Sequence, residues 1–248
     1  MNNFLYKYKA IDKYSLEILI NRELYFPTTN QFNDPFDGQL LPSDFISELK
    51  ELGYAGPVEE ISRHDNFVKD RINGYGVLSL SRVCNDILMW SHYANAHKGM
   101  CLGFKPDLWR YFDNYDWPID HKTVRYSQDH PFKEIHSDLI LQKRFNSNDG
   151  FLNLCEMSSA LEDAAFTVKH SSWSYENEER IISHCAGPHS FRPEALDHIV
   201  LGMNISKTDE ATIKSLLDSS RWRHVRIFKA TRGRAALSVD VNEETIQP

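Results

Sequence analysis

Apolar and polar residues alternate with a period of two in several short segments, which is the pattern of strands that bury one face. Phe4–Tyr8 reads FLYKY, and Tyr75–Arg82 reads YGVLSLSR with Leu78 and Leu80 on one side. Short apolar runs bounded by turn residues add further candidates. The sequence therefore predicts strands at residues 4–8, 24–26, 75–82, 100–104, 124–126, 173–180, 198–203, 225–230 and 236–241.

Longer segments between these strands carry the wider apolar spacing of amphipathic helices. Asp12 is placed to cap one helix, and Asn85 or Asp86 is placed to cap another, which Gly99 would end. The pattern predicts helices at residues 12–22, 44–73 in two pieces, 86–98, 131–146, 151–170 and 207–220.

The order of these elements has no regular strand-helix-strand repeat, which favours an α+β fold over a doubly wound sheet. We expect mixed, mostly antiparallel small sheets with a central cleft. The chain would form one domain over residues 1–248, with helical insertions at 44–73 and 131–170.

The stretch Trp173–Arg180 (WSYENEER) carries the strongest candidate chemistry. If it is a strand, its period places Glu176, Glu178 and Arg180 on one face. Two neighbouring carboxylates cannot both ionise freely, so a cation must lie close by or one carboxylate must hold a proton. Arg180 and Lys169 are the candidate cations. The alternative is a solvated edge strand with alternating charges.

Two other stretches could border the same site. Asp86–Phe104 (DILMWSHYANAHKGMCLGF) places Trp90, His92, Tyr93, His97 and Lys98 in one short helix and its following turn, where large polar-tipped side chains can stack on and hydrogen-bond a ligand. The turn-rich loop 28–38 (TTNQFNDPFDG) carries Asn33, Asp34 and Asp37, which either build the turn or reach into the site.

Composition and motifs exclude several classes of protein. The net charge of −7 argues against a general nucleic-acid coat, and four scattered cysteines without a C-x-x-C pair argue against a zinc site or a disulfide framework. The sequence contains no G-x-G-x-x-G, Walker A, G-x-S-x-G or H-E-x-x-H motif. It also has no signal peptide and no membrane-spanning apolar run, so we expect a cytoplasmic protein with no membrane partner.

Several motifs together resemble a bacterial family catalogued as domain of unknown function number 2971. They are LYKY, NDPFD, LMWSHYANAHKG, Lys169 and W-x-Y-E-x-E-x-R, and the resemblance spans Tyr6 to about Gly202. Two positions depart from the family pattern: Glu179 stands where an aromatic residue is expected, and Leu80 where a phenylalanine is expected. This family implies no activity.

More distantly, the order of elements resembles the ADP-ribosyltransferase fold, in which NAD lies in a cleft between two small sheets. That resemblance implies an NAD-consuming ADP-ribosyltransferase or NAD glycohydrolase, as a toxin or anti-phage effector acting on a protein or nucleic-acid acceptor. Glu178 would be the catalytic carboxylate, Glu176 would position the nucleophile or share a proton, and His92 would bind ribose or phosphate. The implied NAD-binding residues are Tyr6, Tyr8, Ser79, Ser81, Arg82, Trp90, Tyr93, Lys98, Lys169 and Arg180.

Two alternatives remain open at this point. A metal-dependent nuclease or phosphoesterase could hold Mg²⁺ or Mn²⁺ with carboxylate oxygens, assisted by Lys169 or His92. A non-enzymatic module could bind a nucleotide or a peptide in the aromatic cleft, with the Glu-Arg row as a structural ion-pair network. The candidate metal ligands are Asp34, Asp37, Glu176 and Glu178.

Overall fold

The computed structural model describes residues 4–38, 47, 58–113, 119–129, 150–234 and 236–243. Its main feature is an eight-stranded sheet with strand order β12-β11-β10-β4-β1-β3-β8-β5. Neighbouring strands are antiparallel except β10 and β11, which are parallel. The strands are β1 (Leu5–Lys9), β3 (Gly76–Ser81), β4 (Met100–Phe104), β5 (Ile119–Thr123), β8 (Glu178–Ser183), β10 (Leu196–Leu201), β11 (Arg226–Arg232) and β12 (Val239–Glu243).

Two short sheets of two strands each accompany the large one. Antiparallel β2 and β9 form the first, and parallel β6 and β7 form the second. The fold is therefore α+β with a mostly antiparallel sheet, as the sequence predicts, but the expected small sheets are replaced by one large sheet. The strands of the short sheets are β2 (Glu23–Phe26), β9 (Gly187–Ser190), β6 (Arg125–Ser127) and β7 (Val168–His170).

The large sheet separates two hydrophobic cores, because successive side chains of a strand point to opposite faces. On one face Leu5 and Leu102 pack with α1 and α7, and on the other Tyr6 and Cys101 pack with α4. The α-helices are α1 (Lys13–Asn21), α3 (Val58–Gly74), α4 (Ile87–Tyr93), α6 (Gly150–Thr167) and α7 (Lys207–Leu217). The 3₁₀ helices are η1 (Thr29–Gln31), η2 (Leu108–Tyr111), η4 (Ser171–Glu176), η5 (Pro193–Ala195) and η6 (Ser220–Trp222).

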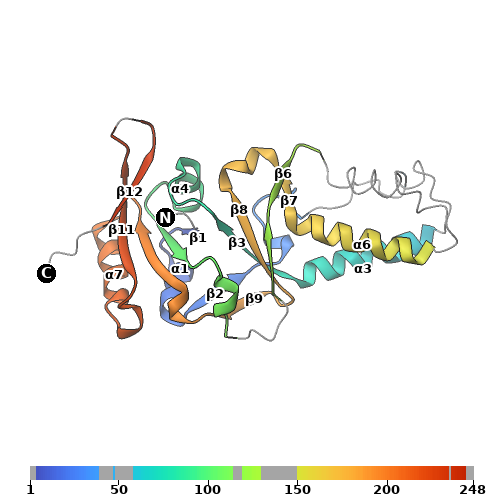
Figure 1. Cartoon of the computed structure of the whole chain (residues 1–248), viewed down its shortest axis with the longest axis horizontal. Helices are drawn as coiled ribbons and strands as arrows, with labels where there is room; N and C mark the ends of the chain where they lie inside the picture. Colours follow the sequence, from blue (N-terminus) through green and yellow to red (C-terminus); the bar gives the residue numbers. More distant parts are fainter. Residues whose placement is uncertain are drawn as a thin grey trace.

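The helices α3 and α6 lie side by side and project from one end of the sheet, opposite the end formed by β11, β12 and α7 (Figure 1). An ion pair of 3.1 Å between Arg71 Nη2 and Glu162 Oε2 joins them. These two helices belong to the predicted insertions. The parts of those insertions at residues 44–46, 48–57 and 131–149 lie outside the described residues.

Side-chain caps place the starts of two helices where the sequence predicts them. Asp12 accepts a hydrogen bond of 2.8 Å from the Ser15 amide, and the Ser15 hydroxyl accepts one from the Asp12 amide, which completes a capping box. Asp86 accepts a bond of 2.9 Å from the Met89 amide.

Three sequence predictions need correction, and some strands were missed. The helix after Asp86 ends at Tyr93 and not at Gly99, since Asn95, Ala96 and His97 take left-handed conformations with φ of 47°, 52° and 66°. The predicted helix 151–170 ends at Thr167, and its last three residues form β7. The predicted strand 173–180 begins only at Glu178, after a 3₁₀ helix. Strands β5 and β9 were not predicted at all.

The strands β1 and β3 pair at a single position, Tyr6 opposite Ser81. By contrast, β1 pairs with β4 along its whole length, and β3 pairs with β8 in the same way. Beyond the Tyr6–Ser81 pair the two strands part, and the ammonium of Lys7 bridges the gap to the carbonyl of Ser79 at 2.6 Å. The parting opens the middle of the sheet to a cavity.

Candidate active site

A cavity of about 260 Å³ lies where β1 and β3 part. Strands β1, β3 and β8 contribute Lys7, Ser79 and Glu178, and α4 contributes Tyr93. The loop after β2 adds Phe32, Asn33 and Asp37. The cavity therefore collects side chains from elements that are far apart in the sequence, which is the usual construction of a ligand site.

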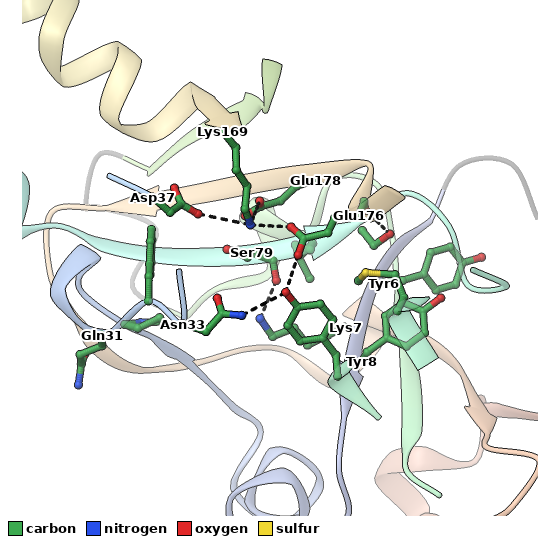
Figure 2. Close-up of a pocket in the computed structure, with 16 residues that line it drawn as sticks. Tyr6, Lys7, Tyr8, Gln31, Asn33, Asp37, Ser79, Lys169, Glu176 and Glu178 are labelled. Atoms are coloured by element: carbon green, nitrogen blue, oxygen red, sulfur yellow. Dashed lines mark hydrogen bonds and ion pairs between the residues drawn. The ribbon is translucent and has the colours of Figure 1, made fainter. Parts of the chain in front are cut away.

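Three carboxylates of the cavity converge on one ammonium group (Figure 2). Lys169 Nζ lies 2.6 Å from Glu176 Oε2, 3.0 Å from Glu178 Oε2 and 3.3 Å from Asp37 Oδ2. All four side chains are buried. Charges taken out of water need partners of opposite sign, and Lys169 supplies one to each carboxylate.

Arg180 is the second cation of this cluster. Its Nε lies 2.8 Å from Glu178 Oε1, and its Nη2 lies 3.2 Å from Glu178 Oε2 and 2.6 Å from Asp37 Oδ2. The guanidinium is fully buried and stands over the Phe32 ring, with 5.3 Å from Cζ to the ring centroid. This fork of two N–H donors fixes the orientation of the Glu178 carboxylate.

The local fold brings Glu176 and Glu178 together in a way that the sequence analysis did not foresee. Glu176 ends the 3₁₀ helix η4, Asn177 takes a left-handed conformation with φ of 43°, and Glu178 begins β8. Glu178 and Arg180 share one face of the strand as predicted, whereas Glu176 reaches the same place from the preceding turn. The Ser81 hydroxyl donates a hydrogen bond of 2.6 Å to the backbone carbonyl of Glu176 and so holds that turn against β3.

The two glutamates have opposite protonation tendencies. Burial alone would raise the pKa of Glu178, but Arg180 and Lys169 outweigh it and hold that pKa well below the ordinary value. Burial raises the pKa of Glu176 above its ordinary value, although Lys169 and the hydroxyl of Tyr93 oppose the shift. Glu178 is therefore a fixed negative charge, and Glu176 is the carboxyl that holds a proton more readily.

Polar and aromatic groups surround this pair. The Tyr93 hydroxyl donates to Glu176 Oε1 at 2.5 Å and accepts from Asn33 Nδ2 at 3.3 Å. Asp37 Oδ1 is buried and has no hydrogen-bond partner among the described residues. An unpartnered buried oxygen next to a cavity is an acceptor available to a ligand hydroxyl.

Lys7 is a cavity residue that the sequence analysis missed. Burial lowers the pKa of Lys7 to about 7, and the nearby charge of Lys9 acts in the same direction. Its one signal in the sequence is that a lysine stands between two tyrosines in the segment FLYKY, where the alternation marks it only as the polar position.

The structure brings together most, but not all, of the predicted site residues. Arg180 does not line the cavity, but it donates a hydrogen bond to Glu178, which does. Tyr8 borders the cavity but uses its hydroxyl on the Val83 carbonyl at 2.9 Å. Those that line the cavity are Tyr6, Tyr8, Ser79, Ser81, Tyr93, Lys169, Glu176 and Glu178.

Four predicted residues lie elsewhere. Trp90 is fully buried and donates through its indole to the Cys84 carbonyl at 2.9 Å. His92 is exposed and its Nδ1 lies 3.0 Å from the Tyr175 hydroxyl, while Lys98 is exposed in the turn after α4. Arg82 pairs with Glu179 at 2.5 Å. None of these four lines the cavity.

The predicted metal ligands do not form a metal site. Asp37, Glu176 and Glu178 do converge, but the ammonium of Lys169 occupies the point that a divalent ion would share. Asp34 instead accepts a hydrogen bond of 2.9 Å from the Phe36 amide, which stabilises the turn that contains both residues. Among the described residues, no group of three or more His, Cys, Asp or Glu side chains is arranged to hold a metal ion.

The two positions that depart from the family pattern are direct partners across β3 and β8. Leu80 faces Glu179 in the register of these strands. Glu179 is fully buried and lies on the face of β8 opposite Glu178, with Arg82, His121 Nε2 at 2.8 Å and Thr123 Oγ1 at 2.9 Å. Both departures therefore lie side by side on the face of the sheet opposite the Glu178 side chain.

Comparison with known proteins finds a family match over part of the chain. No described helix is long and apolar enough to cross a membrane. No curated protein and no solved structure matches the chain. Residues 89–181, which include most of α4 together with Lys169, Glu176 and Glu178, match the model of a family described as protein of unknown function (DUF2971).

Proposed function

We propose that the protein is an NAD-consuming enzyme that cleaves the bond between nicotinamide and ribose in the cavity between β1 and β3. One observation carries the proposal. A carboxylate with a strongly lowered pKa, Glu178, is held next to a carboxyl with a raised pKa, Glu176, in a cavity with an unpartnered acceptor. Such a pair is typical of sites that stabilise a cationic sugar and handle a proton.

The charge of the cluster suits this reaction. Cleavage of the nicotinamide-ribose bond passes through an oxocarbenium-like ribose, which a fixed negative charge stabilises. Three carboxylates and two cations leave one excess negative charge when all are ionised. That charge attracts the positive pyridinium ring of NAD and the developing positive charge on ribose.

The remaining groups of the cavity can orient the substrate. Asp37 Oδ1 would accept a bond from a ribose hydroxyl, and the rings of Phe32 and Tyr93 would contact the nicotinamide. A volume of about 260 Å³ suits only the reacting end of NAD, so the adenosine half would extend out of the cavity.

The parting of β1 and β3 supports the proposed likeness to the ADP-ribosyltransferase fold, in which NAD lies between two sheets. Water as the nucleophile would make the protein a glycohydrolase, and a protein or nucleic-acid nucleophile would make it an ADP-ribosyltransferase. A role as a toxin or anti-phage effector extends this proposal, because depletion of NAD or modification of essential acceptors harms a cell.

The experiment is nicotinamide release from NAD by the purified protein, with and without cell lysate as a source of acceptors. Glu178→Gln should lower release by about 100-fold or more, since one charge aimed at the transition state is worth that much. Glu179→Gln is the matched control, because it changes the neighbouring buried glutamate on the opposite face of β8. Melting temperatures of all three proteins separate lost chemistry from lost folding.

Equal release by Glu178→Gln and the wild type would refute the role of Glu178. No release by the folded wild-type protein, with lysate present, would refute NAD cleavage itself.

A further inference from the structure

The cavity needs a group that takes the proton of the attacking nucleophile, and Glu178 is poorly suited to that task. Both of its oxygens already accept bonds from Arg180, and one also accepts a bond from Lys169. A carboxylate held this firmly in its ionised form binds a proton weakly.

Glu176 is also occupied. Its two oxygens accept bonds from Lys169 Nζ at 2.6 Å and from the Tyr93 hydroxyl at 2.5 Å. These donors hold the carboxylate in place and can orient a nucleophile through it, but no oxygen of Glu176 is left without a donor.

Lys7 lies on the other side of the same cavity. Its Nζ donates to the Ser79 carbonyl at 2.6 Å across the gap between β1 and β3, and the residue lines the cavity together with Glu176 and Glu178 (Figure 2). A neutral amine keeps such a bond with one of its hydrogens, so its lone pair stays available to the cavity.

We propose that Lys7 is the general base of the reaction, whose neutral amine accepts the proton of the nucleophile that attacks ribose. This inference rests on the proposed function. In the step, the nucleophile oxygen forms a bond to C1 of the nicotinamide ribose while its proton passes to Lys7 Nζ. The C1–nitrogen bond breaks, its electron pair goes to the pyridinium nitrogen, and neutral nicotinamide leaves. The Lys7 ammonium then returns its proton to solvent.

The surroundings of Lys7 make an unprotonated amine accessible near neutral pH. Burial and the charge of Lys9 favour the neutral form and outweigh the opposing attraction of Glu178 and Glu176, while Lys169 adds to the repulsion. The resulting pKa of about 7 means that Lys7 is an ammonium below pH 7 and a base above it. A general base is most effective when its pKa lies near the working pH.

The test has two arms. The first measures nicotinamide release against pH for the wild type and for Lys7→Arg, which keeps the positive charge but cannot lose its proton. Release by the wild type should rise with pH to a midpoint near 7. Lys7→Arg should lose kcat by about 100-fold or more with little change in KM, and the rise should vanish. The control is Lys9→Arg, two residues further along the same strand. It should keep both the kcat of the wild type and the rise of release with pH.

The second arm titrates Lys7 directly in the wild-type protein and needs no variant. Acetic anhydride acetylates neutral amines, and mass spectrometry of peptides reports the rate at each lysine. Lys7 should become reactive with a midpoint near 7, well below the ordinary value for a lysine side chain. Lys7→Met, which removes the amine but keeps an unbranched apolar side chain, checks the assignment of that peptide.

The outcomes separate the two proposals. Normal nicotinamide release by folded Lys7→Arg, or a Lys7 midpoint near the ordinary value for a lysine side chain, overturns the role of Lys7 and leaves NAD cleavage standing. No release by the wild type overturns NAD cleavage and the base role with it, even if Lys7 titrates near 7. If Lys7→Arg loses the release shown by the wild type, and Lys7 is acetylated with a midpoint near pH 7, both NAD cleavage and the role of Lys7 as the base are supported.

Discussion

At the scale of single residues, the site depends on neighbouring side chains that hold their charges differently. Arg180 and Lys169 lower the pKa of Glu178 and keep it ionised, whereas burial raises the pKa of Glu176. The hydroxyl of Tyr93 is the contact that acts on Glu176 alone within this cluster. Its removal is therefore the most selective change available.

Tyr93→Phe should destabilise the protein more at pH 8 than at pH 5. The pKa of Glu176 is already raised by burial, so its protonated form favours folding at low pH and this benefit is lost as pH rises through the folded-state pKa. Loss of the hydroxyl bond raises that pKa further and enlarges the loss at pH 8. Melting temperatures at both pH values measure the difference.

Tyr126→Phe is the control for this experiment, because the Tyr126 hydroxyl accepts a bond of 2.8 Å from the Glu178 backbone amide. An amide does not titrate in this range, so its effect should be the same at both pH values. Equal destabilisation by Tyr93→Phe at pH 5 and pH 8 would contradict the shifted protonation of Glu176.

The spacing of Glu176, Glu178 and Arg180 could be recognised from the sequence, but their partners could not. A period of two requires only that Glu178 and Arg180 share a face. That Lys169 meets three carboxylates, and that Lys7 bridges two parting strands, depends on contacts between segments up to 143 residues apart, such as Arg180 and Asp37. No local pattern encodes such contacts.

At the scale of elements, the turn between η4 and β8 sets the relative positions of the two glutamates. Asn177 makes this turn with φ of 43°, a conformation that asparagine and glycine adopt more readily than other residues. The prediction of a strand at 173–177 was wrong because Trp173 and Tyr175 alternate with polar residues as they would in a strand. The left-handed conformation of Asn177, which separates the 3₁₀ helix from β8, leaves only a weak signal in the sequence.

Asn177→Val should destabilise the protein by about 1–3 kcal/mol, since a β-branched side chain is strained at positive φ. It should also lower nicotinamide release by moving Glu176 relative to Glu178. Asn177→Gly, which tolerates this backbone, should retain release. Urea denaturation and the release assay measure the two effects. If the valine and glycine variants behave alike, the left-handed turn does not position the glutamates.

At the scale of the whole molecule, the buried charges join segments that the fold brings from distant parts of the chain. Asp37 comes from the loop after β2, and Glu178 comes from β8 in the large sheet. Lys169 comes from β7, which follows the projecting helix α6 in the sequence. The overall α+β class followed from the order of elements in the sequence. The size of the sheet did not, because strand patterns give no information on which strands pair.

Lys169→Met should destabilise the protein by about 3–5 kcal/mol, because it leaves buried carboxylates without one of their cations. Lys122→Met is the surface control. Lys122 pairs with Asp163 at 3.0 Å and with Asp120 at 3.1 Å, but its side chain is 33% exposed. Its loss should cost about 1 kcal/mol or less. Midpoints of urea denaturation compare the two, and similar values would contradict the central place of Lys169.

The most direct test of NAD binding in this cavity is a crystal structure of the protein with a non-hydrolysable NAD analogue that has a carbon in place of the oxygen in the ring of the nicotinamide ribose. We expect the nicotinamide and its sugar to occupy the cavity between β1 and β3, with a sugar hydroxyl on Asp37 Oδ1 and C1 facing Glu178. An analogue bound at another place, or an empty cavity at millimolar analogue, would contradict the assignment of this cavity to NAD.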